Sequence, residues 1–386
     1  GVSNMRARRE RRVLYLLLAC ALVVYGALAL ALMGGEQTQT EYAGIQLQAA
    51  QLLDRCFQQV KGYKEELGIP LQELDYHQTG MLGEGYTGIT TTLGALEAKR
   101  TTACPDMGAL CVRLLQEAGV RPGDTVGAGF SGSFPAMNLA VVAACQAMEV
   151  RLVYISSVGS STYGANNPEL TFPEMVHRLV EDGLLETDSA AVTLGGGSDV
   201  GGGMEPALVE EVAGRLKGMG LPLMAEEDFQ RNLERREELY RTQGPIRCFI
   251  AVGGNVTSMG RGESGIGLGQ GLLRPERPPR LTQESGLVQR YLAQGISVIH
   301  LLNIKRLAAD YGIPFDPERW PEPGASPVYF RASYPALPLW LGLAGAAVLL
   351  GLCAWIRARD GILAAREAEK ECDDGKAEQR VENSDN

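Results

Sequence analysis

Histidine is scarce in this chain, and its cysteines lack metal-binding spacing. The 386 residues include three histidines, His77, His177 and His300, with no HExxH motif, which disfavours a histidine-rich metal site. Eight cysteines occur without a CxxC pair. A disulfide such as Cys104–Cys111 would be compatible with a location outside the cytoplasm, but the spacing leaves the pairing open. We therefore predict no metal site.

Blocks of Lys and Arg are also absent beyond the first twelve residues. The chain has 36 Lys plus Arg against 46 Asp plus Glu, a formal net charge of −10. Because nucleic-acid binding depends on neutralising phosphates with Lys and Arg, this balance excludes nucleic acid as a partner. Residues 1–12 carry a formal charge of +4 and residues 357–386 a formal charge of −3, so residues 34–336 carry −11.

Two stretches, residues 13–33 and 337–356, contain no Asp, Glu, Lys, Arg or His. At about 1.5 Å per residue, helices of this length cross the roughly 30 Å hydrocarbon core of a membrane. Five arginines lie within residues 6–12, and Arg357 and Arg359 follow the second stretch. Because flanks rich in Lys and Arg stay in the cytoplasm, we predict that both termini are cytoplasmic.

This topology divides the chain into five parts. They are a basic cytoplasmic flank (1–12), a transmembrane helix (13–33), an extracytoplasmic α/β domain (34–336), a second transmembrane helix (337–356) and a charged cytoplasmic tail (357–386). The membrane is expected to be the cell (inner) membrane. A cleaved signal peptide is the alternative for the first stretch, although its apolar run exceeds the usual ~7–15 residues.

Segments of strand and helix length alternate through the centre of the domain. We predict strands over 125–130, 151–156, 190–194, 246–252 and 296–301, and helices from Pro135, over 169–184 and over 206–219. This alternation predicts an α/β fold with a mostly parallel sheet of Rossmann-like βα units. Apolar periodicity adds helices over 42–66, 281–290 and 304–311.

Loops rich in Gly, Ser and Asn follow four of the predicted strands, at 131–138, 156–168, 195–204 and 253–260. The carboxyl ends of parallel strands meet at one sheet edge, where ligands bind. Gly permits close backbone approach, hydroxyls and amides donate hydrogen bonds, and the helix start at Pro135 adds positive dipole character. We predict a pocket for a carboxylate or another anion.

A further hydroxyl-rich loop (87–94) precedes two cations, Lys99 and Arg100, which could pair with a ligand carboxylate. The alternative is that Gly and Ser only satisfy tight βα turns, and that the cations lie on a solvated helix face. The candidate ligand-binding residues are Thr90, Thr91, Lys99, Ser131, Gly132, Ser133, Asn138, Ser157, Ser160, Asn166, Asn167, Gly196, Ser198, Asp199, Gly254 and Asn255.

A GxGxxG motif spans Gly127 to Gly132, between a predicted strand and a predicted helix. In dinucleotide-binding folds the partner carboxylate follows about 20 residues later, at the end of the next strand. Glu149 has that separation but falls at the end of the helix. We predict no dinucleotide and no other cofactor.

A second motif, Gly129 to Ser133, resembles the nucleophile elbow of serine hydrolases, with Ser131 as nucleophile and His177 or His300 as the base. Ser133 stands where the motif requires Gly. The match is therefore incomplete.

Six longer blocks carry a resemblance to a known family. They lie at 79–101, 118–124, 129–141, 155–175, 195–204 (GGGSDVGGGM) and 253–260 (GGNVTSMG). Together they resemble the bacterial poly-γ-glutamate system protein family over about residues 79 to 260. The resemblance implies a membrane-anchored accessory component of poly-γ-glutamate biosynthesis or export, with the poly-γ-glutamate ligase and export subunits as partners. It implies no catalytic residues.

Two functions stay open. The first is that accessory role, with a glutamate polymer or a small anion as ligand. A domain at −11 repels a polyanion at long range, which favours capture of a chain end over wrapping of the polymer. The second is an extracytoplasmic amide hydrolase that acts on γ-glutamyl polymer through a serine nucleophile.

Overall fold

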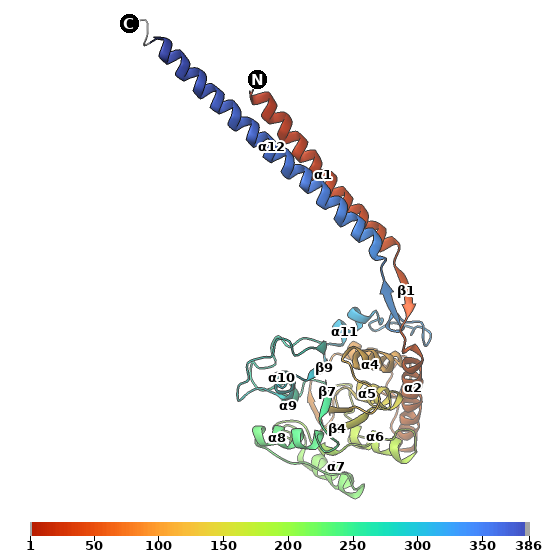
Figure 1. Cartoon of the computed structure of the whole chain (residues 1–386). Coiled ribbons are helices and arrows are strands. Elements are labelled where there is room, and N and C mark those ends of the chain that lie inside the picture. The colour runs from red at the N-terminus through yellow and green to blue at the C-terminus, as the bar shows by residue number, and fades with distance from the viewer. Residues whose placement is uncertain (1, 383–386) are drawn as a thin grey trace. The chain divides into compact units, whose positions relative to one another are not determined.

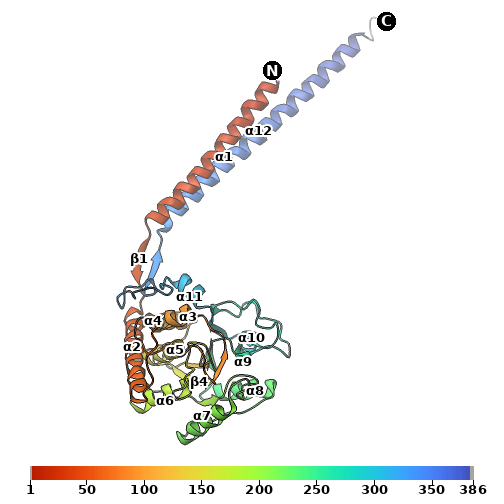
Figure 2. The ribbon, with the colours of Figure 1, turned by 180° about the vertical axis from the view of Figure 1, so that it is seen from behind.

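The computed structural model describes residues 2–382, which divide into two compact units. One unit, here the α/β unit, comprises Gln39–Phe330. The other, here the helical unit, combines the segments before and after it in the chain. Figures 1 and 2 show the elements of each unit from two opposite sides.

The helical unit consists mainly of two long helices that pack side by side, α1 (Val2–Met33) and α12 (Ala336–Glu382). They run antiparallel, with the start of α1 and the end of α12 at the same end of the pair (Figure 1). Within them, Glu10–Met33 and Ala336–Lys370 are long and apolar enough to cross a membrane. Only 6% and 17% of their most apolar stretches are buried, whereas a core helix of a soluble protein would be mostly buried.

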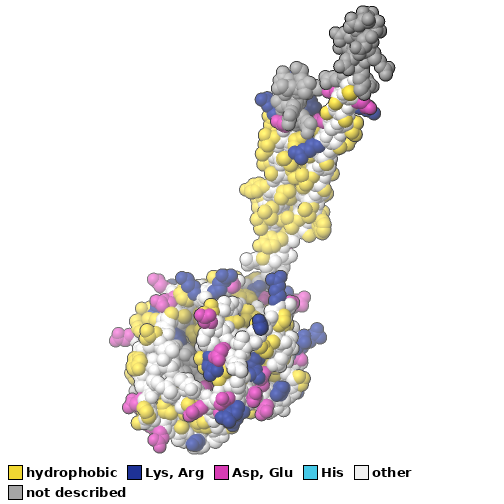
Figure 3. Space-filling model, turned by 90° about the vertical axis from the view of Figure 1, so that its left-hand side faces the viewer, with side chains coloured by type: hydrophobic (Ala, Val, Ile, Leu, Met, Phe, Trp, Pro, Cys, Tyr) yellow, Lys and Arg dark blue, Asp and Glu magenta, His cyan; other side chains and the backbone are white. Residues whose placement is uncertain are grey.

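Small residues allow the two helices to approach closely, as is common between membrane helices. A Cβ added to Gly342 would lie 2.3 Å from the Cβ of Ala27. On the face drawn in Figure 3, hydrophobic side chains cover most of the coloured part of the two helices. Two short strands, β1 (Glu36–Gln39) and β10 (Phe330–Ser333), form a two-stranded sheet at the unit boundary in the chain.

The α/β unit is built on a six-stranded sheet in the order β6-β4-β3-β7-β9-β8. Its strands are β3 (Thr125–Phe130), β4 (Arg151–Ser157), β6 (Ala191–Thr193), β7 (Ile246–Val252), β8 (Gly271–Leu273) and β9 (Ser297–Leu301). All neighbours are parallel except the β8–β9 pair. The predicted fold class and the five predicted strands are confirmed. The edge strand β8 was not predicted.

The strand order reverses beside β3. From β3 the chain proceeds outward through β4 to β6, and then returns to the other side of β3 to form β7 and β9. Such a switch point leaves a crevice outside the carboxyl ends of the two central strands. The crevice here lies beyond β3 and β7.

Side chains on alternate positions of β4 enter two different cores. On β4, Leu152 and Tyr154 belong to the core on one face, and Val153 and Ile155 belong to the core on the other face. The first face is covered by α2 (Ala43–Glu66), α4 (Asp106–Glu117), α5 (Pro135–Ala147) and α6 (Phe172–Glu181). The second is covered by α8 (Phe229–Tyr240) and α10 (Leu287–Ala293).

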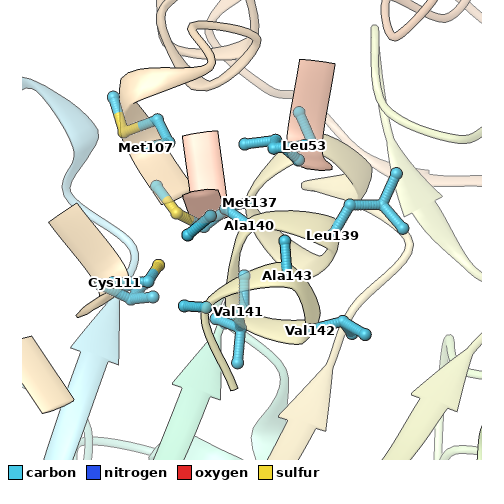
Figure 4. Close-up of a cluster of buried hydrophobic side chains, with 14 of the residues drawn as sticks. Leu53, Met107, Cys111, Met137, Leu139, Ala140, Val141, Val142 and Ala143 are labelled. Atoms are coloured by element: carbon cyan, nitrogen blue, oxygen red, sulfur yellow. The ribbon is translucent and has the colours of Figure 1, made fainter. Parts of the chain in front are cut away.

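Helix α5 is the central helix of the first core. Every residue from its start at Pro135 to Cys145 is buried. Its side chains lie against Leu53 of α2 and against Met107 and Cys111 of α4 (Figure 4). Proline at the first helical position starts the helix directly after the loop that follows β3, which fixes that loop against the core.

Two predicted helices begin later than expected. The helix predicted over 169–184 starts at Phe172, because the Pro173 ring would clash with the carbonyl of residue 169 in a longer helix. Thr171 and Glu174 form a capping box there. The helix predicted over 281–290 is α10, which starts at Leu287. Gly286 is its N-cap residue, and the Gln289 side chain accepts from the Gly286 backbone N–H. The remaining helices are α3 (Leu96–Thr102), α7 (Pro206–Gly218), α9 (Val256–Met259) and α11 (Ile304–Tyr311).

The disulfide considered between Cys104 and Cys111 is not present. Both cysteines are free and buried, and burial raises the pKa of each thiol to about 12. They act as small apolar side chains in the core between α4 and its neighbours.

Candidate functional site

A cavity of about 500 Å³ lies at the carboxyl ends of the central strands. Residues from the loops after β3, β4, β6 and β7 line it, together with the segment 91–99. The four Gly- and Ser-rich loops therefore meet around one space. Of the candidate residues, the cavity is lined by Thr91, Lys99, Ser131, Ser133, Ser157, Gly196, Asp199, Gly254 and Asn255.

The other candidate residues serve the loop structure. Asn138 donates from Nδ2 to the Ser131 carbonyl at 2.7 Å, and Ser160 donates to the Ser161 carbonyl at 2.8 Å. Gly132 is in contact with a neighbouring loop, since a Cβ there would lie 2.7 Å from the Val158 carbonyl oxygen.

Asn166 joins two loops through its side chain. Its Oδ1 accepts from the Glu84 N–H at 2.8 Å, and its Nδ2 donates to the Glu84 carbonyl at 2.8 Å and to Thr90 Oγ1 at 3.1 Å. Asn167 Nδ2 donates to Glu84 Oε1 at 2.8 Å. Ser198 takes a left-handed backbone conformation (φ 53°) in its loop. These residues, Thr90 included, shape the cavity without lining it.

Lys99, on α3, is the cation of the cavity wall. Its side chain is 4% exposed, and Nζ donates to Ser161 Oγ at 2.6 Å and to the Ser133 carbonyl. Nζ also lies 3.9 Å from the centre of the Phe134 ring. Burial lowers the pKa of Lys99 to about 7, well below the usual 10.5. Arg100 differs, because it forms a two-bond ion pair with Asp316 at 2.7 Å.

Three serines form a hydrogen-bonded chain beside Lys99. Ser131 Oγ donates to Ser133 Oγ at 3.0 Å, and Ser133 Oγ accepts from the backbone N–H of Ser161 at 3.0 Å. Ser161 lies on β5 (Ser160–Ser161), which pairs in parallel with β2 (Thr90–Thr92). Successive strand residues point to opposite sides. Ser160 therefore points away from the cavity and Ser161 lines it.

A buried ion pair neutralises the cavity's one lining carboxylate. Asp199 accepts from Arg236 Nη2 at 2.6 Å, from Thr193 Oγ1 at 2.8 Å and from Asn232 Nδ2 at 3.1 Å. Arg236 is 3% exposed. Lys99 and Asp199 are the ionisable residues among those that line the cavity. With Asp199 paired to Arg236, no carboxylate of the described part of the chain pairs with Lys99, and the cavity favours an anion.

Neither sequence motif for a known active site forms one here. Ser131 has an ordinary negative φ and bonds to Ser133, without the strain of a nucleophile elbow. His177 bonds through Nδ1 to Asp188 at 2.6 Å, and His300 through Nδ1 to the Gly269 carbonyl at 2.9 Å. Neither histidine lines the cavity, so the predicted serine–histidine pair does not form.

The glycines of the GxGxxG motif have structural roles. Gly127 lies inside β3, where a Cβ would meet the Tyr240 ring at 3.1 Å. Among residues 2–382, no group of three or more His, Cys, Asp or Glu is placed to hold a metal ion. Comparisons with known proteins found no matching family model, no matching curated protein and no matching solved structure.

Proposed function

We propose that this chain is a membrane-anchored accessory component of poly-γ-glutamate biosynthesis or export, and that its α/β unit binds a carboxylate end of the polymer. The observation that supports this most directly is the cavity at the carboxyl ends of the strands, where the lining cation, Lys99, is hydrogen-bonded to neutral oxygens alone among the described residues. A carboxylate would supply the opposite charge that this buried ammonium lacks.

The rest of the cavity suits the same ligand. The hydroxyl-bearing residues Thr91, Ser131 and Thr257 line it. Within the described residues, the backbone N–H groups of Gly254 and Asn255 donate to no other group, so they are available to a ligand oxygen. Because a cavity of about 500 Å³ admits only a few residues, a chain end fits it better than a polymer bound along its length.

The membrane arrangement is part of the proposal. We propose that both termini lie in the cytoplasm and the α/β unit outside the inner membrane. Two helices of sufficient length and apolarity, with arginines before the first and after the second, support this topology. The ligase and export subunits are the proposed partners, on the strength of the resemblance over residues 79 to 260.

Deletion of the gene for this chain in a polymer-producing cell that encodes it should reduce or abolish poly-γ-glutamate. The measurement is the yield and chain length of released polymer. Restoring the full chain should restore the polymer, and the Lys99→Met variant should restore less than wild type. Unchanged yield and length after deletion would contradict the proposed role.

Carboxylate binding should take up protons near neutral pH. A bound carboxylate favours the charged form of Lys99, whose pKa in the free protein is about 7. Affinity for γ-linked triglutamate should then be constant below pH 7 and fall above it, by up to about tenfold per pH unit. Isothermal titration calorimetry of the full chain in nanodiscs, in buffers of different ionisation enthalpy, measures this uptake.

Two lysine variants distinguish proton uptake caused by a ligand at Lys99 from an effect shared by any buried lysine. Lys64 is also buried, and burial lowers its pKa to about 8, but its Nζ donates to the Leu82 carbonyl, away from the cavity. Lys64→Met should keep both binding and proton uptake, and Lys99→Met should lose most of both. Binding without proton uptake in the wild-type chain would show that Lys99 does not face the ligand charge.

A further inference from the structure

The amine of Lys99 and the hydroxyl of Ser161 are in contact, and these are the functional groups of a base and a nucleophile. Lys99 Nζ lies 2.6 Å from Ser161 Oγ, and both residues line the cavity. Their exposed fractions are 4% and 5%, so bulk water does not solvate the amine. A serine hydroxyl beside a desolvated amine is an arrangement in which the amine can accept the hydroxyl proton.

We propose that Ser161 is a nucleophile, that Lys99 is its general base, and that the pair catalyses acyl transfer from an amide. That the amide is a γ-glutamyl amide rests on the proposed function above. The pair itself stands on its own geometry.

The surroundings keep Lys99 available as a base. Among the described residues, Asp199 is the other ionisable residue that lines the cavity, and it is paired with Arg236. No carboxylate therefore holds Lys99 in its charged form, and burial brings its pKa to about 7. A substantial fraction is then neutral at physiological pH, as a general base requires.

The neighbouring loops fix both side chains. The Ser161 N–H donates to Ser133 Oγ at 3.0 Å, and Lys99 Nζ donates to the Ser133 carbonyl. Gly94 packs directly over the pair, because a Cβ there would lie 2.8 Å from Ser161 Oγ and 3.0 Å from Lys99 Cε. Ser133 and Gly94 are thus positioning residues, and the hydroxyls of Ser131 and Ser133 hold the pair in place.

The reaction needs no oxidant, reductant or metal. Ser161 Oγ forms a bond to the amide carbonyl carbon while its proton passes to Lys99 Nζ. The carbon–nitrogen bond breaks, and Lys99 returns the proton to the leaving amine. Water then attacks the serine ester to release a carboxylic acid, or a second amine attacks it to form a new amide. A substrate carboxylate raises the pKa of Lys99, so this rate should rise with pH over a higher range than with an uncharged reagent.

Covalent labelling tests the pair on the full chain in nanodiscs. A fluorophosphonate, which serine nucleophiles displace at phosphorus with loss of fluoride, should modify Ser161, and peptide mass mapping identifies the residue. The labelling rate should rise with pH and level off above about 7. It should be about 100-fold lower in Lys99→Met, in keeping with removal of a general base, and unchanged in Lys64→Met. Ser161→Ala should not be labelled.

Three results would overturn the inference: no adduct on the wild-type chain, an adduct on Ser131 or Ser133 instead, or equal rates in wild type and Lys99→Met. Mapping on the wild-type chain decides the site even if Ser161→Ala fails to fold. Triglutamate binding separates the two proposals. Labelling of Ser161 without triglutamate binding supports the catalytic pair and rejects the proposed ligand. Triglutamate binding without labelling of Ser161 supports the proposed ligand and rejects the catalytic pair.

Discussion

Replacing Arg236 by Met should destabilise the α/β unit by about 3–5 kcal/mol near pH 7, the usual cost of leaving one partner of a buried ion pair alone. Arg236 and Asp199 have side chains that are 3% and 10% exposed, with a 2.6 Å contact between Nη2 and Oδ2. Without the guanidinium, Asp199 keeps its bonds to Thr193 and Asn232 but loses its only positive partner among the described residues.

Urea unfolding of the full chain in detergent, followed by circular dichroism, measures this loss. Combining Arg236→Met with Asp199→Asn should recover much of the stability, because a neutral pair is easier to bury. Arg306→Met is the control: its i,i+4 pair with Asp310 is 68% and 44% exposed, and its loss should cost under about 1 kcal/mol. Equal losses in Arg236→Met and Arg306→Met would contradict this account.

The sheet could be predicted from the sequence because its strands are local signals. Apolar runs such as 125–130 and 246–252 end in Gly- and Ser-rich loops, and apolar patterns of helix length separate them. Each strand can therefore be predicted from its own residues, without knowledge of its neighbours in the sheet. The meeting of four loops around one cavity followed from the parallel arrangement, since it places all carboxyl ends at one edge.

The identity of the reactive serine could not be predicted. Ser160 was a candidate and Ser161 was not, but Ser161 lines the cavity. The choice between adjacent residues depends on the pairing of β5 with β2, from a segment about 70 residues earlier in the chain. A strand of two residues is too short to show the alternation that would reveal which side chain faces inward.

Arg236 was missed for a related reason. Helix α8 also carries Arg231 and Arg235, and the sequence does not distinguish the buried arginine from its neighbours. Its burial follows from a loop, 195–204, that brings Asp199 over the helix in a left-handed conformation (φ 63°). The electrostatics of the cavity therefore depend on a contact between two segments that the sequence presents as unrelated.

Lys99→Met should change how the stability of the chain depends on pH. In the folded protein the pKa of Lys99 is about 7, and in the unfolded chain it is close to the usual 10.5. Between these values the unfolded state binds more protons, so this residue makes wild-type stability rise with pH. The gain from Lys99 between pH 7 and pH 9 should be about 2 kcal/mol.

The variant should lack this rise. Relative to wild type, Lys99→Met should be most favourable at and below pH 7, where wild type buries a charged ammonium, and should lose that advantage towards pH 9. Urea unfolding of both chains at pH 6, 7, 8 and 9 measures the difference. Lys64→Met is the matched comparison, because the pKa of Lys64 in the folded chain is about 8 and its rise should begin about one pH unit later. A parallel offset between wild type and Lys99→Met across this range would mean that Lys99 keeps an ordinary pKa. It would then be neither a base for Ser161 nor a source of proton-linked carboxylate binding.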